Sequence, residues 1–213
     1  MRLSGGERSG QRLAAPRGAR TRPTPAKVRE ALFAVLGKRV EGARVLDLFA
    51  GSGALGFEAI SRGAASVVFV DNDANAVMSI RRNAVRLIPD PERWRILPMT
   101  ASRALRTLRG TFDVVLVDPP YQRGAAEELT LLMQRGLLAQ SGVAVVEHPS
   151  SARATLPASL SLLKQTRYGD TALTFAIVRG DGETVPEDRV QTVASRRSSP
   201  AKTPGGRRRP GTR

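Results

Sequence analysis

The sequence predicts an α/β fold built on one mostly parallel sheet of seven strands. From residue 43 onward, short apolar runs rich in β-branched residues alternate with helical segments, which is typical of a parallel sheet covered on both faces. Two further strand-like runs follow at the end of this pattern. At 213 residues and 41% hydrophobic content, the chain is long enough for one such domain with a core and short appendages.

The N-terminal part is expected to precede the sheet as a short extension. Residues 1–23 are rich in Gly, Arg and Pro and have little apolar periodicity. They form either a small hairpin around Gly5-Gly6 or an arm that orders on its target. A helix follows, with Pro25 in its first turn and Gly37 at its end.

The alternating pattern also sets the bounds of the remaining elements. Strands are expected at residues 44–49, 66–71, 94–99, 112–118 and 142–147, and helices at 54–62, 73–87, 101–108 and 125–138. The runs 160–167 and 171–178 flank the sequence Tyr-Gly-Asp, so they predict an antiparallel hairpin that closes the sheet.

Three regions result from this assignment. Residues 1–39 form the extension and first helix, and residues 40–179 form the central domain. Residues 180–213 are expected to be a disordered basic tail, because they contain almost nothing to bury.

The net charge of +15 is concentrated at the two ends of the chain. Residues 1–39 carry ten basic and two acidic side chains, residues 189–213 carry eight basic and no acidic ones, and the stretch between is nearly neutral. Cationic arms attract polyanions by counterion release, which indicates a nucleic-acid partner. Basic ends that only keep the protein soluble are the alternative.

Several classes of protein are excluded or disfavoured. The chain has no cysteine, which excludes disulfides, thiolate metal sites and cysteine nucleophiles. No His, Asp or Glu cluster has metal-ligand spacing, so no metal is expected. There is no signal-peptide pattern and no run near the ~20 apolar residues that span a bilayer, so we expect a cytoplasmic protein with no membrane partner. His148 is the only histidine and lacks a serine nucleophile turn, so no catalytic role is expected for it.

A glycine-rich turn follows the first predicted strand. Residues 51–56 read Gly-Ser-Gly-Ala-Leu-Gly, and Asp71 ends the next strand 20 residues after Gly51. This is also the dinucleotide fingerprint, so an NAD oxidoreductase is one alternative. Asp47 favours S-adenosylmethionine, because a carboxylate beside the turn repels a pyrophosphate but attracts a cationic amino-acid group. The glycines and helix N–H groups would accept the methionyl part, and Asp71 would accept hydrogen bonds from the ribose.

A second loop follows the strand predicted at residues 112–118. Asp118-Pro119-Pro120-Tyr121 lies at the carboxyl end of that strand, where open α/β sheets bind ligands. If Asp118 and the Pro119 carbonyl each accept one hydrogen of a base's exocyclic amine, the nitrogen can pyramidalise and aim its lone pair at a sulfonium methyl. The prolines stiffen the loop, and Tyr121 offers a face for the base to stack on. A Pro-Pro turn in which Asp118 only caps the next helix is the alternative.

Six segments, in order along the chain, resemble one known family. They are residues 22–24, 28–33, 46–56, 58–64, 118–121 and 168–171. Together they resemble the RsmD family over about residues 1–178. These are bacterial methyltransferases that modify the exocyclic 2-amino group of one guanine, guanine 966, in 16S ribosomal RNA.

The resemblance implies a Rossmann-like class I methyltransferase fold with a short N-terminal extension used in RNA recognition. It implies S-adenosylmethionine as methyl donor, the small ribosomal subunit or its assembly intermediate as partner, and a monomeric enzyme. The cofactor residues it implies are Asp47, Ala50, Gly51, Ser52, Gly53, Asp71, Asn72 and Thr100. For the guanine it implies Asp118, Pro119, Pro120 and Tyr121, together with Arg22, Thr24 and Arg29 of the N-terminal signature.

The chain departs from the family pattern in three places. Residues 2–7 at the N-terminus are less apolar than the family's usual start. Residues 99–102 read Met-Thr-Ala-Ser, where such enzymes usually offer an acidic or amide side chain to the adenine ring. The basic tail is not a family feature. Two other functions stay open: methylation of an adenine amine in DNA, and non-catalytic RNA binding during assembly. Against the DNA enzyme, the chain lacks an obvious domain for reading duplex sequence.

Overall fold

The computed structural model describes residues 1–16, 25–120 and 123–180. Within them it confirms the α/β fold and a single sheet of seven strands in the order β3-β2-β1-β4-β5-β7-β6. The strands are β1 (Arg44–Leu48), β2 (Ser66–Asp71), β3 (Trp94–Pro98), β4 (Phe112–Val117), β5 (Leu138–Pro149), β6 (Leu160–Tyr168) and β7 (Thr171–Val178).

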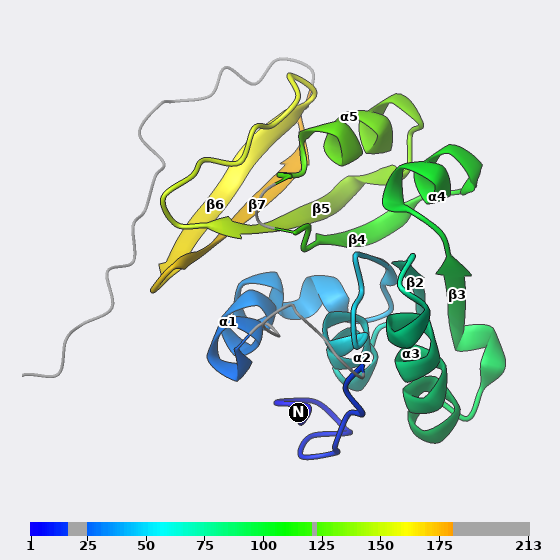
Figure 1. Cartoon of the computed structure of the whole chain (residues 1–213). Coiled ribbons are helices and arrows are strands. Elements are labelled where there is room, and N and C mark those ends of the chain that lie inside the picture. Colours follow the sequence, from blue (N-terminus) through cyan, green and yellow to red (C-terminus); the bar gives the residue numbers. More distant parts are fainter. Residues whose placement is uncertain (17–24, 121–122, 181–213) are drawn as a thin grey trace, which may run out of the picture.

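Five α-helices cover the two faces of the sheet (Figure 1). On one face lie α1 (Ala26–Leu36), α2 (Ala54–Ser61) and α3 (Ala74–Leu87), and on the other lie α4 (Ala101–Thr107) and α5 (Ala126–Gln134). Successive strand residues point to opposite faces, so Val45 joins the core under the first group of helices and Leu46 the core under the second. Burial on both faces explains why the central parallel strands β1, β2 and β4 read as mainly apolar runs.

The strand order creates a switch point at the centre of the sheet. β1 pairs in parallel with both β2 and β4, and Leu48 lies in register with Val70 on one side and Val117 on the other. From β1 the chain continues through β2 to β3 in one direction, and it then builds β4 and β5 in the other. In such sheets the crevice beyond the carboxyl ends of the strands binds the ligand.

The N-terminal residues form the small hairpin, so the alternative of an arm that orders only on its target does not hold for residues 1–16. Arg2 and Arg12 form an antiparallel bridge. Leu3 and Leu13 are 2% and 4% exposed in the core shared with α1 and α2. The backbone N–H of Ser4 donates to Glu58 at 2.9 Å, which fastens the hairpin to α2.

The closing hairpin is also confirmed. Tyr168 at the end of β6 pairs with Thr171 at the start of β7 in antiparallel register. Gly169 in the connecting turn has φ +60°, a conformation that glycine adopts without a steric cost.

One boundary differs clearly from the prediction. The helix expected at residues 125–138 ends at Gln134, and Gly136 reverses the chain with φ +60°. Leu138 already belongs to β5, which continues to Pro149 because β7 pairs with its second half. The exposed Gln140 and its neighbours carry no apolar signal, so sequence periodicity could not detect the early start of this strand.

Among the described residues, no helix combines the length and apolarity needed to cross a membrane. Residues 181–213 of the predicted tail lie outside the described residues.

Candidate cofactor and acceptor site

The turn after β1 is shaped by three residues in the left-handed region. Phe49, Gly51 and Gly53 have φ of +61°, +56° and +77°. The N–H of Gly53 donates to the Ala50 carbonyl at 2.7 Å, and Gly53 is the N-cap of α2. The expected strand therefore ends one residue early, at Leu48, because Phe49 has already left the extended conformation.

The glycines of the turn have different physical roles. A Cβ at Gly51 would meet nothing within 4 Å, so this backbone faces open space above the sheet. A Cβ at Gly56 would lie 2.4 Å from a ring carbon of Phe69, so this glycine lets α2 approach β2. The first glycine thus fits close approach by a ligand, and the last one serves helix–strand packing, as expected for a nucleoside-binding turn.

Asp71 holds the turn from the neighbouring strand. Its carboxylate accepts hydrogen bonds from the backbone N–H of Gly51 at 2.7 Å and of Asp73 at 2.9 Å. The side chain is half-buried, and a carboxylate has about four acceptor positions, so capacity for ribose hydroxyls remains.

A pocket next to this carboxylate brings together part of the predicted cofactor set. Its empty volume is about 280 Å³, including space open to solvent. Asp71, Asn72 and Thr100 of the predicted cofactor set line it. Met99 and Ala101 line it as well, and so do Phe49, Val70 and Arg123, which the sequence interpretation did not include. Met99 lies where such enzymes usually offer an acidic or amide side chain to the adenine ring. Its thioether gives the pocket an apolar wall at this position.

Asp47 lies beneath the turn and not at its surface. It is 1% exposed, and its carboxyl accepts a hydrogen bond from the Gly56 N–H at 2.9 Å. Burial raises the pKa of Asp47 to about 8; that hydrogen bond lowers it, and the nearby Asp118 and Asp71 raise it further. The carboxyl therefore lies under the turn, where burial disfavours its charged form.

The Asp-Pro-Pro loop leaves β4 at the same edge. Asp118 is half-buried, Pro119 is buried and Pro120 is exposed. The Pro120 carbonyl accepts the Arg123 N–H at 2.9 Å. Tyr121 lies outside the described residues.

A larger pocket opens between this loop and the end of β5. It has an empty volume of about 620 Å³ and is lined by residues that include Pro119, Pro120, Glu147 and His148. Glu147 directly follows Val146, which is in register with Val117, the residue before Asp118. The sequence interpretation missed Glu147, because its position beside Asp118 depends on strand register.

Arg123 connects the two pockets and was also missed. It lines both of them, and its guanidinium lies 5.9 Å from the centre of the Phe49 ring. It pairs with Glu128, which is 1% exposed, at 2.7 Å, and with Glu127 at 3.2 Å. A buried carboxylate on α5 thus holds a cation between the two parts of the site.

His148 has a structural environment. Its Nδ1 lies 2.9 Å from the Pro149 carbonyl, and its Nε2 lies 2.8 Å from the Thr174 hydroxyl. Since a carbonyl only accepts, Nδ1 carries the proton and Nε2 accepts from the hydroxyl. Both ring nitrogens therefore have hydrogen-bond partners in the structure.

Arg29 does not lie where a substrate contact was expected. It is 2% exposed, and one guanidinium N–H donates to the Arg2 carbonyl at 2.7 Å. Burial lowers its pKa. The side chain joins α1 to the N-terminal hairpin, so a direct contact with a substrate is not supported. Arg22 and Thr24 lie outside the described residues.

Comparison with known proteins assigns the family. The family described as Conserved hypothetical protein 95 matches residues 1–177. Ribosomal RNA small subunit methyltransferase D of Escherichia coli K12 is 34% identical over 185 residues, covering 86% of this chain and 92% of that protein. The chain belongs to the RsmD family. The protein of the same name from Haemophilus influenzae is 31% identical over 79% of this chain and 89% of its own length.

Solved structures similar to this RsmD-family chain agree on the fold. The Escherichia coli protein yhhF superimposes with a TM-score of 0.75 at 34% identity, covering 84% of this chain and 97% of its own. A hypothetical protein of Thermus thermophilus gives 0.71 at 33% identity, with 84% and 99% covered. The Rossmann-like class I methyltransferase fold is therefore confirmed. The RsmD-family match ends at residue 177, so the basic tail lies beyond it.

Among the described residues, no group of three or more His, Cys, Asp or Glu side chains could hold a metal ion.

Proposed function

We propose that this protein transfers the methyl group of S-adenosylmethionine to the 2-amino group of a guanine in 16S ribosomal RNA, at the position equivalent to guanine 966. One observation carries the proposal: the glycine turn and the Asp-Pro-Pro loop leave the paired strands β1 and β4 at the same level, since Leu48 is in register with Val117. Family membership and the names of the relatives support RNA as the acceptor.

The residues around the turn fit the cofactor. Asp71 and Asn72 would hold the ribose, Thr100 and Met99 would face the adenine, and the open backbone at Gly51 would admit the methionyl part. Ala50, Ser52 and Gly53 complete the turn, and Asp47 supports it from below through Gly56. When bound, S-adenosylmethionine supplies a methyl group on a positively charged sulfur.

The acceptor loop would prepare the amine for attack. A guanine amine is a poor nucleophile because its lone pair is delocalised into the ring. Asp118 and the Pro119 carbonyl would each accept one of its hydrogens, which lets the nitrogen pyramidalise. Asp118 would then take the proton that the methylated nitrogen releases. The guanine must be unpaired or flipped, because its amine cannot reach the site from within a duplex.

The acceptor is proposed to be the small ribosomal subunit or its assembly intermediate, and the enzyme is proposed to act as a monomer. We expect Tyr121 to stack on the base, and Arg22 and Thr24 to contact the RNA. All three residues belong to the set that the family resemblance implies.

The direct test is methyl transfer to small subunits, or to their RNA, from cells that lack the enzyme. We expect wild type to incorporate one methyl group, mapped by mass spectrometry as N2-methylguanine. Asp118→Ala should reduce the rate by about 10²–10⁴-fold while binding the cofactor normally, because its carboxylate handles only the acceptor.

Arg167→Ala, an exposed change on the outer strand β6, is the matched control and should keep full activity. DNA is tested in parallel as an acceptor. Full activity of Asp118→Ala, methylated adenine in DNA, or RNA binding without any turnover would each contradict the proposed function.

A further inference from the structure

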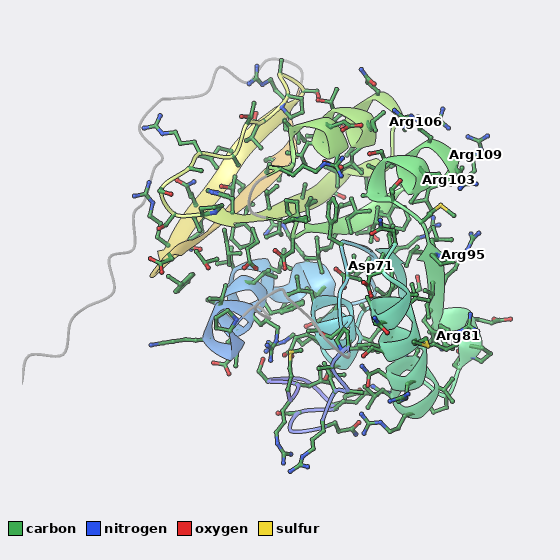
Figure 2. The ribbon with its side chains drawn as sticks, viewed as in Figure 1. Asp71, Arg81, Arg95, Arg103, Arg106 and Arg109 are labelled. Carbon is green, nitrogen blue, oxygen red and sulfur yellow. The ribbon has the colours of Figure 1, made fainter. Side chains whose placement is uncertain are left out.

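Five arginines follow the edge of the molecule at strand β3, and we name them the arginine stripe. They are Arg81 on α3, Arg95 on β3, Arg103 and Arg106 on α4, and Arg109 after α4. All five side chains are exposed, and Figure 2 shows them along one side of the molecule. β3 is an outer strand of the sheet, with no neighbour on its far side among the described residues.

None of the five guanidinium groups has a carboxylate partner within residues 1–16, 25–120 and 123–180. The ion pairs found there join Arg8, Arg62 and Arg123 to glutamates. The stretch between the two basic ends of the chain is close to neutral as a whole. The five positive charges of this cluster are therefore not balanced by ion pairs, and they repel one another.

Protection of the sheet edge does not explain the stripe. A charged side chain on an outer strand prevents pairing with another molecule, and Arg95 alone would serve that purpose. Arg81, Arg103 and Arg106 lie on helices that have no open edge to protect.

The stripe begins next to the cofactor pocket. Thr100 and Ala101 line that pocket, and Arg103 lies in the first turn of the helix that Ala101 opens. Arg106 is one turn further along, on the same side of α4. On α3, the exposed Met78 and Val85 lie three residues before and four residues after Arg81, so charged and apolar side chains share one face.

We propose that the arginine stripe is a docking surface for the sugar-phosphate backbone of the acceptor RNA. Arginine binds phosphate by paired N–H groups, and the apolar side chains on α3 suit the sugar and base faces between phosphates. The inference rests on the proposed function for the identity of the RNA. It adds a contact surface on the folded domain, separate from the two basic ends of the chain.

The test compares two double variants with the same change in charge. The stripe variant is Arg95→Glu with Arg106→Glu, and the control is Arg167→Glu with Arg135→Glu. Each pair takes one arginine from an outer strand and one from the end of a helix, and the control pair lies on β6 and α5. Binding to naked small-subunit RNA and to intact subunits is measured at several salt concentrations, together with cofactor affinity.

We expect the stripe variant to bind naked RNA at least about tenfold more weakly at low salt. The slope of log affinity against log salt should fall by about one to two, and cofactor affinity should stay unchanged. In the control variant, the loss of log affinity for naked RNA should be less than about half of the loss in the stripe variant.

Equal losses in both variants would show a general charge effect and overturn the proposal. Unchanged binding to naked RNA with weakened binding to intact subunits would assign the surface to a ribosomal protein and would also overturn it. If wild type binds RNA through the stripe but transfers no methyl group, the proposed function fails and the docking surface stands.

Discussion

At the scale of single residues, the burial of Asp47 makes the stability of the folded protein depend on pH. Its folded pKa of about 8 means that the folded protein keeps a proton which the unfolded chain releases near pH 4. The stability from this proton is complete below about pH 4 and is lost as the pH rises towards 8.

We therefore expect Asp47→Asn, which keeps an acceptor for the Gly56 N–H, to escape this loss. The Tm of the variant minus that of wild type should increase between about pH 5 and about pH 8. Thermal unfolding across this range measures it. A difference that does not change with pH would mean that Asp47 has an ordinary pKa in the folded protein.

Two glycines of the same turn give separable predictions. Gly51→Ala should cost about 1 kcal/mol of stability, because φ is +56°, and should weaken cofactor binding, because the new methyl group faces the ligand side. Gly56→Ala should cost about 1–3 kcal/mol, because its Cβ would meet Phe69 at 2.4 Å, and the folded fraction should keep its cofactor affinity.

Chemical unfolding and calorimetric titration with the cofactor measure the two effects. The assignment of roles is wrong if Gly51→Ala binds the cofactor like wild type.

At the scale of elements, Asn83 on α3 joins the N-terminal hairpin to the glycine turn. It is fully buried, its Oδ1 accepts from the Ala14 N–H at 2.8 Å, and its Nδ2 donates to the carbonyls of Ala14 and Ser52. Ser79 donates to the same Ala14 carbonyl at 2.7 Å, and within the described residues its side chain makes no hydrogen bond to the turn.

Asn83→Ala should lower stability by about 1–3 kcal/mol, speed hydrogen exchange in residues 1–14 and weaken cofactor binding, since it leaves buried polar groups unpaired. Ser79→Ala is the control: it should loosen the hairpin and preserve cofactor affinity. If both variants bind the cofactor equally well, the hairpin and the turn are not coupled through Asn83.

At the scale of the whole molecule, the net charge is +15, and we expect its basic C-terminal part to serve RNA binding and not the chemical step. Removal of residues 180–213 takes away the basic run at 189–213, so it should weaken RNA binding most at low salt. Turnover at saturating RNA should stay nearly unchanged, because both site loops lie in the folded domain.

A tail of equal length with its eight basic residues changed to serine is the matched control and should behave like the truncation. A collapse of turnover at saturation would instead give the tail a role in the chemistry.

The elements found from the sequence were those with strong local signals. β1, β2 and β4 are mainly apolar runs, and the Gly-Ser-Gly turn marks the boundary after β1. β5 was found only in part, because Leu138 joins the sheet opposite Phe112 of β4 and the polar Gln140 and Ser141 that follow carry no apolar periodicity. The same limit applies to Glu147, which became part of the site through strand register.

The order of amino acids alone was enough to predict the α/β class and the family, which are confirmed, and to single out the two candidate site loops, because these depend on short patterns of neighbouring residues. Packing settled the rest. Asp47 lies under the turn as a buried carboxyl, Arg29 joins the hairpin to α1, and Arg123 connects the two pockets through Glu128. Burial and pairing between distant segments decide such roles, and a local pattern carries no information about either.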